Sequence, residues 1–196
     1  MKSFLFVLLL IGLTFACCHQ SPAKWRGIPA PKDPVQATHN LPKPFRSGDY
    51  VITPLATYTI SAVVLSRDHY RFDRGAKIAP LDLALGWGAM SIAENINQLD
   101  ISQNGRFYEY SWKDEPPMEP SDIITHSANT HCLPADRETR RRLLAIQRHE
   151  VVTLEGYLVD VLFPDGGHWT SSLTRDDSRG GACEVLWVTG VTRKTL

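Results

Sequence analysis

Residues 136–163 read DRETRRRLLAIQRHEVVTLEGYLVDVLF, and this stretch decides the fold. Its first part, 137–148, predicts a helix because Asp136 can cap its N-terminus and the segment carries a narrow apolar stripe. Its second part, 151–163, is rich in β-branched and aromatic residues and ends at the turn sequence Pro164-Asp165-Gly166-Gly167. The stretch therefore predicts a helix followed directly by a long strand.

Strand patterns also lie before this helix. Residues 58–66 alternate between apolar and polar positions, which is the period of a strand. Residues 106–112 alternate too, and Asn104-Gly105 before them predicts a hairpin turn that joins them to a strand at 99–103. Between these patterns we expect 80–98 to be a loop with a short helix at 91–97.

Two further strands are expected after the helix, at 168–173 and 184–191, with a polar loop at 175–181 between them. The order is three strands, one helix, then further strands. This order is typical of a small Greek-key barrel of the OB type. We therefore predict a mainly β, α+β fold with one or two helices and an OB-like barrel; the alternative is an irregular antiparallel sandwich.

The N-terminus has the pattern of a secretion signal. Lys2 precedes an unbroken apolar run from Phe4 to Leu13, and Ala16 offers a cleavage site, so we expect a signal peptide at 1–16. Cys17 then raises the alternative of a lipid-anchored protein, the one way in which we expect this chain to meet a membrane.

We expect a proline-rich tether at 17–47 and a single folded domain at 48–193. Location in a bacterial periplasm, free or membrane-anchored, is the expectation that follows from the signal.

Charge and composition narrow the function classes. The 21 Lys and Arg residues balance 21 Asp and Glu residues, so the basic excess of a nucleic-acid-binding domain is missing and no such partner is expected. His126, His131 and Cys132 lie close in sequence, but their spacing does not suit a metal site. We expect no metal and no cofactor.

The remaining two cysteines of the expected domain, Cys132 and Cys183, would meet an oxidising compartment after export. We therefore predict a disulfide between them. Such a bridge would use up the thiol that any cysteine-dependent chemistry at Cys183 requires.

An aromatic stripe is the strongest candidate for a ligand contact. Tyr108, Tyr110 and Trp112 share one face of a predicted strand and could stack on sugars or on an extended chain, although the same rings could instead belong to the core. Trp87 and Arg175 are further candidate ligand contacts.

The chain resembles a family of bacterial exported proteins with no assigned activity. The likeness covers roughly residues 48–191 and rests on five segments: LALGWG at 83–88, HSAN at 126–129, GYLV at 156–159, SSLTR at 171–175 and GACE at 181–184. It implies a shared fold and export, and it implies no catalytic residues.

A second, partial likeness concerns Cys183. The segment before it is similar to the cysteine motif of periplasmic L,D-transpeptidases, in which Ser-His-Gly-Cys is followed shortly by Arg. Here Gly181-Ala182 replaces His-Gly and Val185 stands near the place of the arginine.

These observations favour a non-catalytic envelope domain that binds a protein, glycan or peptide partner, such as a cell-wall component. The alternative is a cysteine-dependent hydrolase or transpeptidase that acts on cell-wall peptide. In that alternative Cys183 is the nucleophile, activated by His126, His131 or His168 and oriented by a carboxylate such as Asp176.

Overall fold

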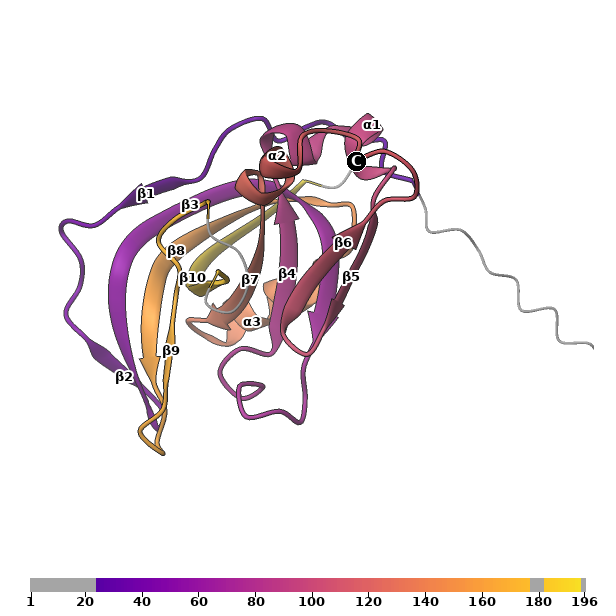
Figure 1. Cartoon of the computed structure of the whole chain (residues 1–196). Coiled ribbons are helices and arrows are strands. Elements are labelled where there is room, and N and C mark those ends of the chain that lie inside the picture. Colours follow the sequence, from indigo (N-terminus) through magenta and orange to yellow (C-terminus); the bar gives the residue numbers. More distant parts are fainter. Residues whose placement is uncertain (1–23, 177–181, 195–196) are drawn as a thin grey trace, which may run out of the picture.

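The computed structural model describes residues 24–176 and 182–194. The expected signal peptide and Cys17 lie outside the described residues. The main body is a mixed sheet of eight strands that curves round on itself, and a separate two-stranded sheet lies beside it (Figure 1). The predicted mainly β, α+β class is confirmed, although the described residues form three α-helices rather than one or two.

Five strands of the large sheet pair in a cycle, which we call the ring: β3 pairs with β4, β4 with β7, β7 with β10, β10 with β8, and β8 with β3. Their bounds are β3 (Tyr50–His69), β4 (Leu81–Gly86), β7 (Ser127–Pro134), β8 (Val151–Leu162) and β10 (Glu184–Lys194). The β7–β10 pair is parallel and the other four pairs are antiparallel. Helix α3 (Arg137–Leu144) lies in the chain between the third and fourth ring strands, where the OB-type order places a helix.

Because β3 is long, it can pair with both β4 and β8, and these two pairings close the ring. The strand pairs with β8 over 51–63 and with β4 over 63–69. Its register shifts at Pro54–Ala56 in the first pairing and at Val64–Ser66 in the second. Such irregularities bend and twist a strand, so one strand can follow the curve of the ring and still pair with two partners.

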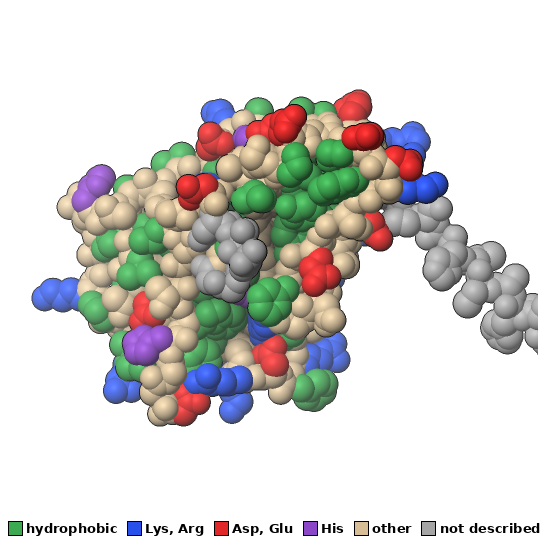
Figure 2. Space-filling model, in the orientation of Figure 1, with side chains coloured by type: hydrophobic (Ala, Val, Ile, Leu, Met, Phe, Trp, Pro, Cys, Tyr) green, Lys and Arg blue, Asp and Glu red, His purple; other side chains and the backbone are tan. Residues whose placement is uncertain are grey.

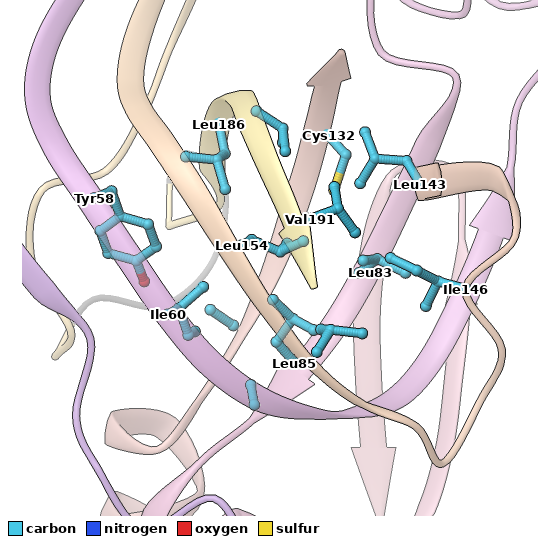
Figure 3. Packing of buried hydrophobic residues seen from close by; sticks show 14 of the residues in the cluster. Tyr58, Ile60, Leu83, Leu85, Cys132, Leu143, Ile146, Leu154, Leu186 and Val191 are labelled. Atoms are coloured by element: carbon cyan, nitrogen blue, oxygen red, sulfur yellow. The ribbon is translucent and has the colours of Figure 1, made fainter. Parts of the chain in front are cut away.

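The interior of the ring is the main hydrophobic core (Figure 3). All five ring strands contribute alternate side chains to it, as the two-residue period of a strand requires. Leu143 and Ile146 add apolar side chains from α3 and the residues after it, and both are fully buried. Burying one such side chain contributes about 1.5–3 kcal/mol.

The hairpin predicted around Asn104-Gly105 is confirmed, but it does not belong to the ring. Strands β5 (Asp100–Asn104) and β6 (Phe107–Ser111) pair with each other in a separate sheet. Gly105 and Arg106 occupy the turn with φ values of 56° and 74°. The ring positions expected for these strands are filled by β4, which lies in the segment predicted to be a loop, and by β7, for which the sequence patterns predicted no element.

Short helices cover one end of the ring near the hairpin. They are the 3-10 helix η1 (Gly88–Ser91), α1 (Ala93–Ile96) and α2 (Pro120–Thr125). Helix α1 confirms the short helix expected at 91–97, whereas α2 was not predicted. Within the described residues, no helix is long and apolar enough to cross a membrane.

Part of the predicted tether is packed onto the domain. Trp25 is 1% exposed, and its Nε1 donates a hydrogen bond of 3.1 Å to the carbonyl of Ser91. Further along, β1 (Val35–Ala37) and β2 (Phe45–Ser47) pair with β3. The segment is extended, as its prolines predict, but from Trp25 onward it contributes to the fold. The remaining strand, β9 (His168–Thr170), pairs with β8.

Candidate functional site

Three polar side chains lie on the outer face of the ring, on strands whose other face is apolar. Asp82 of β4 and Asn129 and His131 of β7 are 0%, 4% and 2% exposed. Strand alternation explains their direction, because Cys132, next to His131, belongs to the interior core. Buried polar groups require partners, and these partners come from the hairpin and from the chain around β9 and β10.

Arg106 joins the hairpin to the ring. Its Nη1 donates to Asp82 Oδ1 at 2.7 Å, and its Nε and Nη2 bind both carboxylate oxygens of Asp73 at 2.8 Å. The guanidinium also lies over the ring of Tyr70, with its Cζ 3.6 Å from the ring centroid. The hydrogen bonds from Arg106 hold the pKa of Asp73 below its usual value. These contacts fix the hairpin turn against β4.

His131 lies beside the same carboxylate. Its Nδ1 is 2.9 Å from Asp82 Oδ2, but the two groups are not aligned for a hydrogen bond. Neither atom has another hydrogen-bond partner among the described residues. A small rotation of the imidazole would align the two groups. The ring of Trp169, from β9, lies 4.4 Å from the imidazole and covers it.

Cys183 lies next to Asn129. The parallel pairing of Glu184 with Thr130 puts Cys183 at the level of Asn129, and Asn129 Nδ2 is 3.7 Å from Cys183 Sγ. The same amide nitrogen donates to the carbonyl of Arg106 at 2.8 Å, and Gln103 Nε2 donates to Asn129 Oδ1 at 2.7 Å. Gln103 Oε1 is buried and has no hydrogen-bond partner among the described residues.

The predicted aromatic stripe lies next to this polar group. Tyr108, Tyr110 and Trp112 are each half-buried, and they pack at the edge of the hydrophobic cluster between the hairpin, β3 and β4. The rings of Tyr110 and Trp112 are stacked, with centroids 6.4 Å apart and an angle of 22°. Tyr108 OH reaches Ser127 Oγ of β7 at 3.4 Å. Figure 2 shows hydrophobic side chains gathered over this part of the molecule.

Of the other two candidate ligand contacts, Trp87 lies in the interior, whereas Arg175 is partly exposed, with 23% of its side-chain surface accessible. Trp87 is 1% exposed and belongs to the core of the ring, so a ligand on the surface does not touch it. Arg175 forms an ion pair with Glu184 and donates to Tyr58 OH at 3.2 Å. Burial raises the pKa of Tyr58 strongly, so its hydroxyl stays protonated. Arg175 thus fixes the chain before β10 onto the ring.

The remaining candidate catalytic residues are spread over the molecule. His126 caps the end of α2, where its Nδ1 is 2.9 Å from the carbonyl of Asp122. His168 is exposed and lies 2.8 Å from Asp160 Oδ2. Asp176 is exposed, at the edge of the described chain. Of the three histidines predicted as candidate bases, His131 lies on the same face of β7 as Asn129. Asn129 in turn is next to Cys183.

The predicted disulfide between Cys132 and Cys183 is not formed. Cys132 points into the ring and is fully buried, and burial raises the pKa of its thiol well above the usual value. Cys183 is half-buried on the opposite side of β7, next to Asn129. The alternation of β7 therefore separates the two thiols.

Sequence reasoning missed Asp82, Gln103, Arg106 and Asn129 as members of this site. The available signal was the presence of polar residues inside short apolar segments, since a charged or amide side chain in a buried strand must face a partner. Across residues 24–176 and 182–194, no group of three or more His, Cys, Asp or Glu side chains is arranged to hold a metal ion.

Comparisons with protein-family models, with curated proteins and with solved structures gave no match to this chain. The site is therefore interpreted from its own geometry.

Proposed function

We propose that this chain is an exported, non-catalytic domain of the cell envelope that binds a glycan chain along the aromatic face of β6. The observation that carries the proposal is the row formed by Tyr108, Tyr110 and Trp112. These rings are half-buried, so each is held in place by the core and still presents surface to a ligand.

Sugars suit such a surface for two reasons. Their C–H faces pack on aromatic rings, and their hydroxyl groups need fixed hydrogen-bond partners, as is typical of ligand sites. The amides of Gln103 and Asn129 lie between the hairpin and β7, and Gln103 Oε1 is an acceptor without a partner in the described chain. In domains with the OB-type order, the face of the second and third strands binds oligosaccharides. Here those strands are β4 and β7, and the hairpin that carries the aromatic row is fixed against them.

The experiment is a titration of the purified domain with N-acetylglucosamine oligomers and with solubilised cell-wall glycan strands, followed by calorimetry. Replacing Tyr110→Ala or Trp112→Ala should weaken binding by roughly tenfold, which corresponds to about 1.4 kcal/mol.

Phe107→Ala is the matched control, because Phe107 is on the other face of β6 and 52% exposed. The glycan affinity of the Phe107→Ala variant should equal that of the unaltered protein. An equal loss in the Phe107 variant, or the absence of binding to both glycan preparations, would contradict the proposal.

Cysteine-dependent acyl transfer is the second candidate, and the contact between Cys183 and Asn129 favours it. His131 follows Asn129 by two residues on the same strand face, a separation of about 6.6 Å along β7. Its Nδ1 is directed to Asp82 and its ring is covered by Trp169. Asn129, whose amide cannot act as a general base, is a neighbour of the thiol, and His131 is held by its own contacts with Asp82 and Trp169.

Cys183→Ser separates the two candidates. Unchanged glycan affinity in this variant agrees with the binding role, whereas loss of a turnover detected with cell-wall peptides would assign the cysteine to catalysis.

A further inference from the structure

A pocket lies at the N-terminal end of α3, and its lining differs in chemistry from the aromatic row. Its volume is about 370 Å³, which falls within the usual range for small-ligand sites. It is formed by the turn between β2 and β3, the loop between β3 and β4, the start of α3, and β10. These segments are far apart in sequence; three of them are connections between elements, and they meet beside β10.

The pocket is lined by three cations. Arg137 and Arg140 are three residues apart on α3, so they lie on the same side of the helix. Lys77, from the loop between β3 and β4, faces the same space. Throughout the part of the chain that the structure describes, none of the three forms an ion pair. Arg141 and Arg142 on the same helix are both paired with Glu138.

One carboxylate lines the pocket, that of Asp136, and it already accepts a hydrogen bond within the protein. Asp136 Oδ1 accepts a hydrogen bond of 2.7 Å from the backbone N–H of Thr139 as the cap of α3, and this hydrogen bond lowers the pKa of Asp136. The pocket therefore carries an excess of positive charge. This excess is local, because the charges of the whole chain balance.

The wall of the pocket is apolar and aromatic. Trp187 of β10 is 7% exposed, Ile78 is 6% exposed, and Tyr50 is half-buried at the start of β3. Such a wall suits the flat or apolar body of a ligand, while the three cations suit its charged group.

We propose that this pocket binds a phosphate group carried on a ring or on another apolar body. A carboxylate would balance one of the three cations, whereas a phosphate monoester carries up to two negative charges and three oxygens that can each accept hydrogen bonds. Two guanidinium groups on one side of a helix match that geometry. The phosphate can belong to a soluble molecule or to the headgroup of an anionic lipid.

The first test is calorimetric titration of the full chain with inorganic pyrophosphate. Arg137→Gln and Lys77→Gln should each weaken binding at least tenfold. Arg141→Gln is the matched control, since it removes the same charge from the same helix outside the pocket, and its affinity should be unchanged. Thermal unfolding verifies that each variant is folded.

Equal weakening in the Arg141 variant, or no binding of pyrophosphate to the unaltered protein, would overturn the proposal. A second arm uses vesicles of phosphatidylglycerol, with vesicles of phosphatidylcholine as the reference. Sedimentation with phosphatidylglycerol that is lost in the Arg137 variant assigns the phosphate to a lipid headgroup. Pyrophosphate binding without sedimentation assigns it to a soluble ligand. Tyr110→Ala should leave the pyrophosphate affinity unchanged, so failure of this proposal and failure of the glycan proposal are distinguishable.

Discussion

The guanidinium of Arg106 lies 2.7 Å from the carboxylate of Asp82, whose side chain is completely buried. Because Arg106 belongs to the hairpin turn and Asp82 to β4, this ion pair holds the small sheet on the ring. Asp82 is also next to His131, so a single buried carboxylate organises both the hairpin and the outer face of β7.

Arg106→Ala should lower the free energy of unfolding by about 3–5 kcal/mol, because it leaves the carboxylate of Asp82 buried without its cation. Arg74→Ala is the control: Arg74 pairs with Asp165 at the surface, where both side chains are more than half exposed, and its loss should cost about 1 kcal/mol or less. Urea unfolding measures both. Asp82→Asn added to the Arg106 variant should recover part of the loss; no recovery would argue against an uncompensated buried charge.

Asp73 makes the stability depend on pH. The hydrogen bonds from Arg106 lower its pKa below the ordinary value of 3.8 in the folded protein. A lowered pKa stabilises the fold above the unfolded-state pKa, and this contribution disappears as the pH falls through the folded-state pKa. Below about pH 4 the unaltered protein should therefore lose stability more steeply than Asp73→Asn, by less than about 1 kcal/mol since Asp73 is partly exposed. Urea unfolding between pH 6 and pH 3 compares the two slopes, and identical slopes would refute the assignment.

Trp25→Ala should destabilise the domain by about 3–5 kcal/mol, because the indole is 1% exposed and packs with Met90 and Ile96. Ile28→Ala, three residues later and 73% exposed, should change stability by less than about 0.5 kcal/mol. Thermal or urea unfolding of the two variants tests whether the N-terminal segment belongs to the fold. If both variants change the free energy of unfolding by the same small amount, the N-terminal segment is a tether and not part of the fold.

The two cysteines should differ in reactivity. Cys183 is half-buried, whereas Cys132 is fully buried and burial raises its thiol pKa. Iodoacetamide should therefore modify Cys183 in the folded protein at least about tenfold faster than Cys132, which becomes reactive on unfolding. Mass spectrometry of the digested, unreduced protein identifies the modified positions. A peptide containing Cys132 joined to Cys183 would show that the predicted disulfide forms after all.

Local sequence patterns predicted the elements that have one solvent-exposed face or that adjoin a strong turn or cap sequence. Strand β8 follows from its β-branched run, the hairpin from Asn104-Gly105, and α3 from its cap at Asp136. Strands β4 and β7 were missed because nearly every residue in them is buried, on both faces, so the alternation that identifies a half-exposed strand is absent.

The candidate site was less predictable than the fold. The aromatic stripe could be identified from its spacing, whereas Trp87, also predicted as a ligand contact, is an interior group, and Arg175 is partly exposed and forms an ion pair with Glu184. The pair of Asp82 with Arg106 depends on how the hairpin docks on β4, and the pocket near Arg137 depends on three connections that meet beside β10. Neither arrangement leaves a local pattern in the sequence.

The pairing of β3 with β8 has a consequence for the way the chain reaches its native state. Val51 pairs with Leu162, roughly a hundred positions further along, and such distant contacts make folding slow. The last strand, β10, inserts between β7 and β8, so those two strands keep unpaired edges until residues 184–194 are in place. Unpaired strand edges are templates for aggregation. A chain of this topology is therefore most vulnerable to aggregation until β10 has been made and has paired, and truncation before residue 184 should yield insoluble protein rather than a smaller domain.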